Sequence, residues 1–400
     1  MEYRLGDLYE VSNGLSKSGD CFGTGFPFLS FSTVFNNYFI PDEIKDLVQS
    51  SDKEQRSYSI KAGDVFITRT SETANELGMS CVALKDYPKA TYNGFCKRLR
   101  PITENTYPLY MGYYFRTAQF RANFLKVASL ITRASLRNED LLKFKVDLPD
   151  IETQKKIASV LSNYDNLIEN NNKRIAILEQ MAENLYKEWF VRFRFPGYET
   201  AEFENGIPVG WEYKKINEMF DTSSGGTPSR SNPEYYDGGT IGWIKTGELL
   251  DSLIIDTEEH ITSAGLQNSA AKLIPVGALL CSMYAGVGKL GITTKEISCS
   301  QATCVFMPKS YVSNIFMFHF LKLNKKYLEN ISFGAAQQNI SQVIINKIKF
   351  LVPTKELVLE YDKRVESIYK QIYTIMLKNK NLIEQRDLLL PRLMSGKLEV

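Results

Sequence analysis

The sequence is poor in the residues that build metal sites and acid–base pairs. It contains two histidines, His260 and His319, and six cysteines, none of them spaced as CxxC. Structural zinc sites draw their ligands from Cys and His at short spacings, which argues against a zinc site. Two histidines also leave little from which to assemble a Cys–His or Ser–His nucleophile pair. We therefore expect free, buried thiols in a reducing compartment.

Long apolar runs and nucleotide-binding loops are missing as well. No stretch of about 18 uninterrupted apolar residues occurs, so no membrane span is expected. Met1–Asp7 does not resemble a signal peptide, and we expect a cytoplasmic protein. In Gly288-Lys289-Leu290 a leucine stands where a P-loop needs Ser or Thr. The two GxG stretches, at 23–25 and 286–288, lack the third glycine of a dinucleotide-binding loop.

One short stretch is similar to a catalytic motif. Asn232-Pro233-Glu234-Tyr235 resembles the Asn-Pro-Pro-Tyr motif of adenine methyltransferases, but a glutamate replaces the second proline. No companion glycine-rich cofactor loop is present in the sequence. We interpret the stretch as a turn. We predict that the chain is not an enzyme and that it has no catalytic residue, no metal ligand and no cofactor of its own.

Positive charge is concentrated in one part of a nearly neutral chain. The formal net charge is +2, yet the window from Lys97 to Lys145 holds ten Lys or Arg and three acids, which leaves +7. The residues around this window are otherwise acidic. Such asymmetry suits a local phosphate-binding face. A solvated basic surface without a ligand is the equal alternative.

An internal repeat is the strongest feature of the sequence. From Ile157 to Trp189, apolar residues recur at steps of four and three, which is the seam of a heptad coiled coil. Adding 204 to each number yields a second ladder, from Tyr361 to Leu393. Two unrelated amphipathic helices are the alternative, and a shared phase argues against it. The seam positions are Ile157, Leu161, Tyr164, Ile168, Asn171, Ile175, Leu178, Ala182, Leu185 and Trp189, then Tyr361, Val365, Ile368, Ile372, Ile375, Asn379, Leu382, Arg386, Leu389 and Leu393.

The ladders divide the chain into four parts. No Pro or Gly interrupts either ladder before Pro391, so we predict long helices over about 151–195 and 354–394. The stretch before each helix mixes short β-rich runs with helical pieces, which predicts two α/β (α+β) globular domains. The segment Phe195–Trp211 is rich in turn residues, and we interpret it as a domain boundary. The predicted domains are 1–150 and 197–353, and the helical regions are 151–196 and 354–400.

Several motifs in the second half carry a family resemblance. They are Ser224-Gly225-Gly226-Thr227-Pro228-Ser229, Gly288-Lys289-Leu290-Gly291, Gly334–Ser341 with Pro353, and Leu389–Gly396. In this order, and together with the repeat, they resemble the specificity subunits of type I restriction-modification systems. The resemblance covers essentially the whole chain. The first domain departs from the pattern, because it lacks the Gly-Gly-Thr-Pro opening.

The resemblance implies an architecture and a function. Two target-recognition domains would alternate with two helices that pair as an antiparallel coiled coil. About 40 helical residues span roughly 60 Å, so the helices would hold the two recognition domains apart. The chain would recognise a bipartite site on double-stranded DNA. It would bring two methyltransferase subunits and a restriction-translocase subunit to that site, and these partners would hold S-adenosylmethionine, ATP and Mg²⁺.

Base and phosphate contacts require Lys, Arg or small polar side chains, and we expect them from such residues in each domain. In the first domain they are Arg69, Thr70, Arg98, Arg100, Arg133, Ser135, Arg137 and Asn138. In the second they are Thr227, Ser229, Arg230, Lys245, Tyr284, Lys289, Gln301, Gln337, Gln338 and Asn339.

Two functions of other classes compete with this interpretation. The first is a self-contained DNA methyltransferase or nuclease, and the second is a structural scaffold without a DNA role. Methyl transfer by the chain alone would identify the first, and the absence of protection in a DNA footprint would identify the second.

Overall fold

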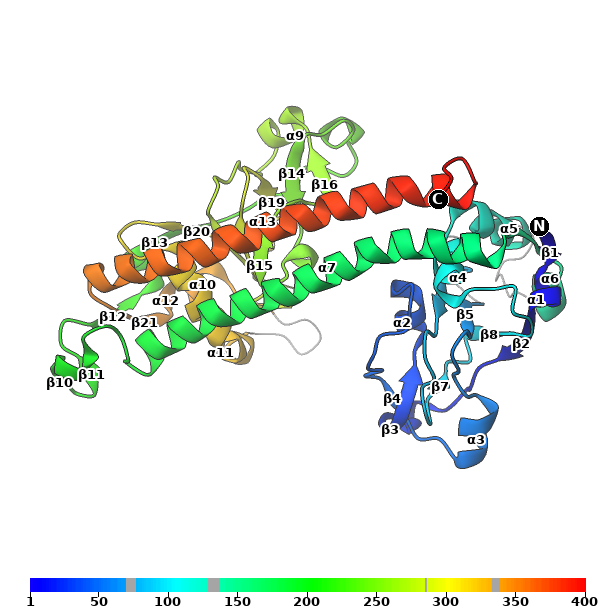
Figure 1. Ribbon diagram of the computed structural model, residues 1–400. Helices are drawn as coiled ribbons and strands as arrows, with labels where there is room; N and C mark the ends of the chain where they lie inside the picture. The colour runs from blue at the N-terminus through cyan, green and yellow to red at the C-terminus, as the bar shows by residue number, and fades with distance from the viewer. Residues whose placement is uncertain (70–76, 129–136, 285, 333–338) are drawn as a thin grey trace. The chain divides into compact units, whose positions relative to one another are not determined.

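The computed structural model describes residues 1–69, 77–128, 137–284, 286–332 and 339–400 (Figure 1). The chain divides into two compact units. The first consists of Met1–Glu169 together with Asn381–Val400, and the second of Asn170–Lys380. Two long helices contribute to both units: α7, Ile151–Tyr186, and α13, Lys355–Met394. A π-helical turn, η3 at Lys187–Val191, extends α7.

The first unit is built on a four-stranded antiparallel sheet in the order β2-β8-β5-β6. A three-stranded sheet, β4-β3-β7, and a pair, β1-β9, complete its β-structure. The strands are β1 (Glu2–Arg4), β2 (Tyr9–Asn13), β3 (Phe22–Leu29), β4 (Leu47–Val48), β5 (Val65–Thr68), β6 (Ser80–Val82), β7 (Thr91–Tyr92), β8 (Cys96–Pro101) and β9 (Lys145–Asp147). The short helices are α1 (Leu5–Leu8), α2 (Phe31–Asn36), α3 (Asp52–Ser57), α4 (Pro108–Tyr114), α5 (Ala118–Ala128) and α6 (Asn138–Leu142).

The second unit contains a five-stranded sheet in the order β13-β20-β17-β18-β15 and a three-stranded sheet, β16-β14-β19. The strands are β10 (Phe203–Glu204), β11 (Ile207–Pro208), β12 (Glu212–Lys215), β13 (Phe220–Ser224), β14 (Ile241–Ile244), β15 (Ser252–Ile254), β16 (Glu259–Ile261), β17 (Leu279–Ser282), β18 (Leu290–Thr293), β19 (Ser298–Cys299), β20 (Thr303–Pro308) and β21 (Lys349–Val352). The short helices are α8 (Ile216–Met219), α9 (Ser263–Gln267), α10 (Asn314–Leu323), α11 (Lys325–Asn330) and α12 (Gln342–Lys347).

The two units repeat one backbone plan. The strand order β2-β8-β5-β6 of the first unit corresponds to β13-β20-β17-β18 of the second. Hydrogen bonds outside the strands correspond as well: Leu5 N donates to Phe144 O in one unit, and Ile216 N donates to Ile348 O in the other. The internal repeat predicted from the sequence is therefore confirmed at the level of strand pairing.

The two long helices lie antiparallel within each unit. In the second unit, Ala182 and Tyr186 near the end of α7 share one core with Tyr361 and Val365 near the start of α13. In the first unit, the start of α7 meets the end of α13, where Leu161 shares a core with residues such as Leu393. All twenty ladder positions are buried or half-buried. The predicted fold, with two mixed α/β domains alternating with two paired helices, is confirmed.

The polar residues in the seam are paired with one another. In the second unit, the Asn171 amide donates to Asn379 Oδ1 at 2.8 Å, and Asn379 donates to Asn172 Oδ1 at 2.8 Å. In the first unit, Arg386 donates to Asp165 at 2.6 Å. These bonds engage the two asparagines and the arginine that interrupt the apolar seam, and such pairings can define the register of paired helices. Asn379 is buried and Asn171 and Arg386 are half-buried, so these positions do not simply face solvent.

The seam generates a stability prediction with a matched control on the same helix. Leu161 is fully buried, whereas Leu167 is 52% exposed. We expect Leu161→Ala to destabilise the protein by about 2–5 kcal/mol, because it removes buried methyl groups and leaves a cavity. Leu167→Ala should change stability by no more than about 0.5 kcal/mol. Urea denaturation followed by circular dichroism measures both, and equal losses for the two variants would show that α7 does not bury this face.

Candidate nucleic-acid interface

A polar cluster lies at one end of the main sheet in the first unit. Lys97, on β8, donates through Nζ to Asn13 Oδ1 at 3.2 Å and to Asn138 Oδ1. Asn13 ends β2, and Asn138 begins α6. Arg69 directly follows β5, and its backbone N–H donates to Phe95 O at 2.9 Å. Four segments that are distant in the sequence therefore bring their polar residues to one sheet end.

The cluster contains two cations, Lys97 and Arg69, for which the described residues provide no neutralising acid. Burial, and then the charge of Arg69, lower the pKa of Lys97 below its ordinary value. Within the part of the chain that the structure describes, no carboxylate lies within ion-pair distance of Lys97 or Arg69. The Nε atom of Arg69 is buried and makes no hydrogen bond there. Lys97 is 3% exposed and bonded to two amide oxygens, so the half-buried Arg69 is the cation of this cluster that is better placed to meet a phosphate group.

Two other arginine candidates of the first unit are engaged inside the domain. Arg98 is 6% exposed and donates to Ser59 O at 2.8 Å. Arg100 forms a bidentate pair with the buried Asp64, at 2.7 and 2.6 Å. An arginine fork held by a carboxylate has fewer donors left for DNA. A DNA contact by either arginine stays a prediction, and it would have to compete with these bonds.

The remaining candidates of the first unit lie around α6 or outside the described residues. Arg137 is the N-cap residue of α6 and is exposed, and Asn138 follows it with its side chain bonded to Lys97. Thr70, Arg133 and Ser135, like Gln337 and Gln338 of the second unit, lie outside the described residues.

The corresponding sheet end of the second unit collects another group of candidates. Tyr284, which is 40% exposed, forms an isolated antiparallel bridge with Asn339. Met283 N donates to Ala302 O at 2.8 Å, and Ala302 directly follows the exposed Gln301. Lys289 N donates to Ser282 Oγ at 3.0 Å at the end of β17. The structure therefore brings Tyr284, Lys289, Gln301 and Asn339 to the end of β17.

Other candidates of the second unit surround an acidic residue on β16. Arg230 pairs with Glu259 at 2.6 Å, and Lys245 pairs with the same carboxylate at 2.9 Å. The hydrogen bonds from Arg230 and then Lys245 lower the pKa of Glu259. The charges of both bases are thus partly neutralised, whereas the described residues provide no acid for Lys97 and Arg69. Thr227 is half-buried and Ser229 is exposed, with Ser229 Oγ 2.8 Å from Ser231 Oγ.

Sequence reasoning missed Lys97, Asn13 and Phe95 as site residues. Lys97 belonged to the basic window but was not selected, since its position against Asn13 depends on strand pairing. That register places Asn13 opposite Lys97. The alternation of side chains between the two faces of β8 was the available signal, because it places Lys97 and Arg98 on opposite faces of the strand.

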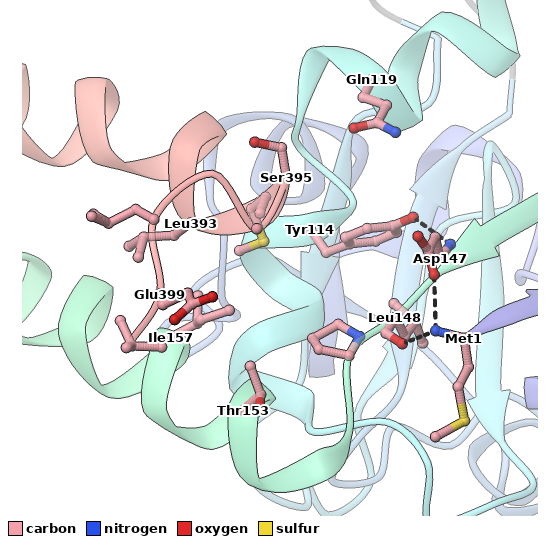
Figure 2. Close-up of a pocket in the computed structure, with 15 residues that line it drawn as sticks. Met1, Tyr114, Gln119, Asp147, Leu148, Thr153, Ile157, Leu393, Ser395 and Glu399 are labelled. Carbon is pink, nitrogen blue, oxygen red and sulfur yellow. Dashed lines mark hydrogen bonds and ion pairs between the residues drawn. The ribbon is translucent and has the colours of Figure 1, made fainter.

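A cavity of about 570 Å³ in the first unit belongs to the helix ends rather than to the polar cluster. Ile157 and Leu393 line it from the seam, and Tyr114 and Asp147 line it from the domain (Figure 2). No candidate DNA-binding residue lines it. Among the described residues, no group of three His, Cys, Asp or Glu could hold a metal ion.

None of the six cysteines is in a disulfide, and five of them are buried. Burial raises the pKa of thiols such as Cys81 and Cys299 to about 12, so these are protonated, unreactive side chains of the cores. In the described part of the chain, no helix is both long and apolar enough to cross a membrane.

Basic, amide and exposed aromatic side chains gathered at corresponding sheet ends are typical of nucleic-acid-binding proteins. A family model described as the type I restriction modification DNA specificity domain matches residues 1–180 and again residues 208–389. The chain belongs to this family. The resemblance noted from the sequence motifs is thereby confirmed.

Relatives extend over nearly the whole chain. The specificity subunit of the type I restriction enzyme HindI from Haemophilus influenzae is 25% identical, with 99% of each chain covered. The MjaIX specificity subunit of Methanocaldococcus jannaschii is 23% identical over 99% of this chain and 93% of the relative. A crystal structure of a type I restriction-modification S subunit from M. genitalium has the same fold, with a TM-score of 0.56 and 13% identity over 98% of this chain and 95% of that chain.

Arg69 and Arg98 form a matched pair for testing the interface. We expect Arg69→Met to weaken DNA binding by the assembled complex and to reduce the slope of log K against log salt by about one, as loss of a phosphate contact does. Arg98→Met should lower stability, because it removes the bond to Ser59, and leave the salt slope unchanged. Fluorescence anisotropy between 50 and 200 mM salt, the range over which phosphate contacts show their effect, measures both. An unchanged slope for Arg69→Met would remove that residue from the interface.

Proposed function

We propose that this chain is the DNA-reading subunit of a type I restriction-modification complex and has no catalytic role of its own. Each unit reads one half of a bipartite site on double-stranded DNA. Two methyltransferase subunits and a restriction-translocase subunit assemble on the chain in the cytoplasm. These partners hold S-adenosylmethionine, ATP and Mg²⁺.

The observation that carries this proposal is the pair of duplicated sheet ends with different side chains. At matching strand positions the first unit has Arg69 and the buried Lys97, and the second has Met283 and Cys304, which are both buried. The exposed aromatic side chains at these sheet ends also differ, with Phe95 in the first unit and Tyr284 in the second. A repeated scaffold with different side chains at its sheet ends suits two different half-sites, because proteins distinguish base edges by the hydrogen-bond donors and apolar groups that contact them. Family membership and relatives of matching length support the same function.

A domain exchange tests the proposal. Residues 1–150 are replaced by those of a relative with a different target, and the complex is expressed in cells whose DNA is then mapped for methylation by long-read sequencing. We expect one half of the methylated sequence to change and the other to stay as it was. A change in both halves would show that the domains do not read independently.

The absence of catalysis is tested with the chain alone. The purified chain, incubated with labelled S-adenosylmethionine and a duplex that carries the mapped site, should transfer no methyl group. The same mixture with the methyltransferase subunits added serves as the positive control. Methylation by the chain alone would favour the alternative of a self-contained methyltransferase.

We infer that the paired helices set the number of unread base pairs between the half-sites. Seven residues are inserted between Asn171 and Ile175, and seven more between Ile375 and Asn379, so that the heptad seam is kept. This adds about 10 Å of helix, close to three base pairs at about 3.4 Å each. We expect methylation mapping to show unchanged half-sites with a gap longer by about three base pairs. A gap of unaltered length would show that the helices do not set the distance between the half-sites. Insertion into α7 alone, which breaks the seam, is the control.

A further inference from the structure

The repeat makes it possible to compare the two sheet ends position by position. The turn before β8 in the first unit and the turn before β20 in the second make the same backbone bonds. Arg69 N donates to Phe95 O at 2.9 Å, and Met283 N donates to Ala302 O at 2.8 Å. The next bond matches as well, because Cys96 N donates to Asn93 O and Thr303 N donates to Ser300 O. Phe95 therefore corresponds to Ala302.

Phe95 presents its ring to solvent from a well-supported turn. Its side chain is 58% exposed, although the strand that follows it begins with buried residues. The backbone N–H of Phe95 donates to Asn93 Oδ1 at 2.7 Å. Its carbonyl is held by Arg69, as described above. Both sides of the residue are thus bonded, so the backbone that carries the ring has a defined conformation.

The preceding glycine shows how closely this turn is packed. Gly94 N donates to Leu15 O at 2.8 Å. A Cβ at Gly94 would lie 2.2 Å from Ser16 Oγ and 3.1 Å from Leu15 O. The turn is therefore pressed against the chain that follows β2. An exposed ring on a rigid support loses little conformational entropy when it meets a ligand.

The surroundings of the ring point to nucleic acid rather than to a protein partner. Phe95 is bonded through its backbone to Arg69, and Lys97 lies two residues along β8, beside the same arginine. Among the described residues neither cation has a carboxylate partner, and Arg69, which is half-buried, is the more accessible of the two because Lys97 is buried. A phosphate held by Arg69 would lie near the turn that carries Phe95, and DNA-binding proteins use Phe both against the thymine methyl group and between base pairs.

We propose that Phe95 places its ring against a base of the half-site read by the first unit, and that this contact is absent from the second unit, where Ala302 stands. The inference rests on the proposed function. It assigns a specificity-determining residue to the first unit. It also gives a physical reason why the two units would read different sequences from one backbone plan.

The test compares Phe95→Ala and Phe95→Leu with Ile102→Ala in the assembled complex. Ile102 directly follows the other end of β8 and is 57% exposed, so it controls for the loss of an exposed apolar side chain. The probe is a duplex that carries the methylated site mapped for the wild-type complex. We expect Phe95→Ala to raise Kd about ten-fold or more, since stacking or apolar base contacts are of that size. Phe95→Leu should show a smaller effect, and Ile102→Ala should match the wild type.

Two base substitutions distinguish the two kinds of contact. If the ring meets a thymine methyl group, replacing that thymine by uracil weakens wild-type binding and leaves Phe95→Ala unaffected. If the ring enters the base stack, 2-aminopurine at that step brightens with the wild type and not with Phe95→Ala. Thermal unfolding of each variant checks that the fold is intact.

The outcomes separate this inference from the function on which it rests. If the wild-type complex binds the mapped duplex tightly and Phe95→Ala binds it equally well, the ring contact is refuted and the proposed function stands. If the wild-type complex binds no bipartite site, the proposed function itself fails. A loss of affinity confined to the first half-site supports the ring contact.

Discussion

The antiparallel seam between α7 and α13 is the constraint on which the rest of the structure depends. Each unit takes part of its core from both helices: Tyr186 and Tyr361 lie in the core of the second unit, and Leu161 and Leu393 in that of the first. Neither globular copy therefore closes its core with its own strands alone. Because each helix packs into two cores, both cores restrict its length and register. The Asn171–Asn379 and Arg386–Asp165 hydrogen bonds pair the polar residues that interrupt the apolar seam.

This constraint leaves the far ends of the sheets as the places where sequence can vary. Among the described residues, the first unit places Arg69 and the buried Lys97 there without an acidic partner, and the second has the buried Met283 and Cys304 at the same strand positions. Charge supplies affinity for any DNA through phosphates, whereas discrimination depends on side chains that meet base edges. The backbone scaffold is thus repeated in the two units, whereas the side chains at the sheet ends differ between them.

The sequence predicted the long helices and the repeat because both depend on local periodicity, which the chain displays directly from Ile157 to Trp189. It did not predict the composition of the site, because that depends on strand register. Arg98 and Arg100 looked alike as basic residues, yet pairing with β5 and β2 buries Arg98 and sets Arg100 against Asp64. Lys97, their neighbour, joins the polar cluster instead. The candidates Thr70, Arg133, Ser135, Gln337 and Gln338 follow strands or precede helices, and they lie outside the described residues.

The central claim is that a single chain reads DNA through two separate units. Hydroxyl-radical footprinting of the assembled complex on a duplex that carries its methylated site tests this claim most directly. The account predicts two protected patches separated by a stretch that remains open to cleavage, with one patch weakened by Arg69→Met and the other unaffected. A single continuous patch, or weakening of both patches by that one substitution, would contradict it.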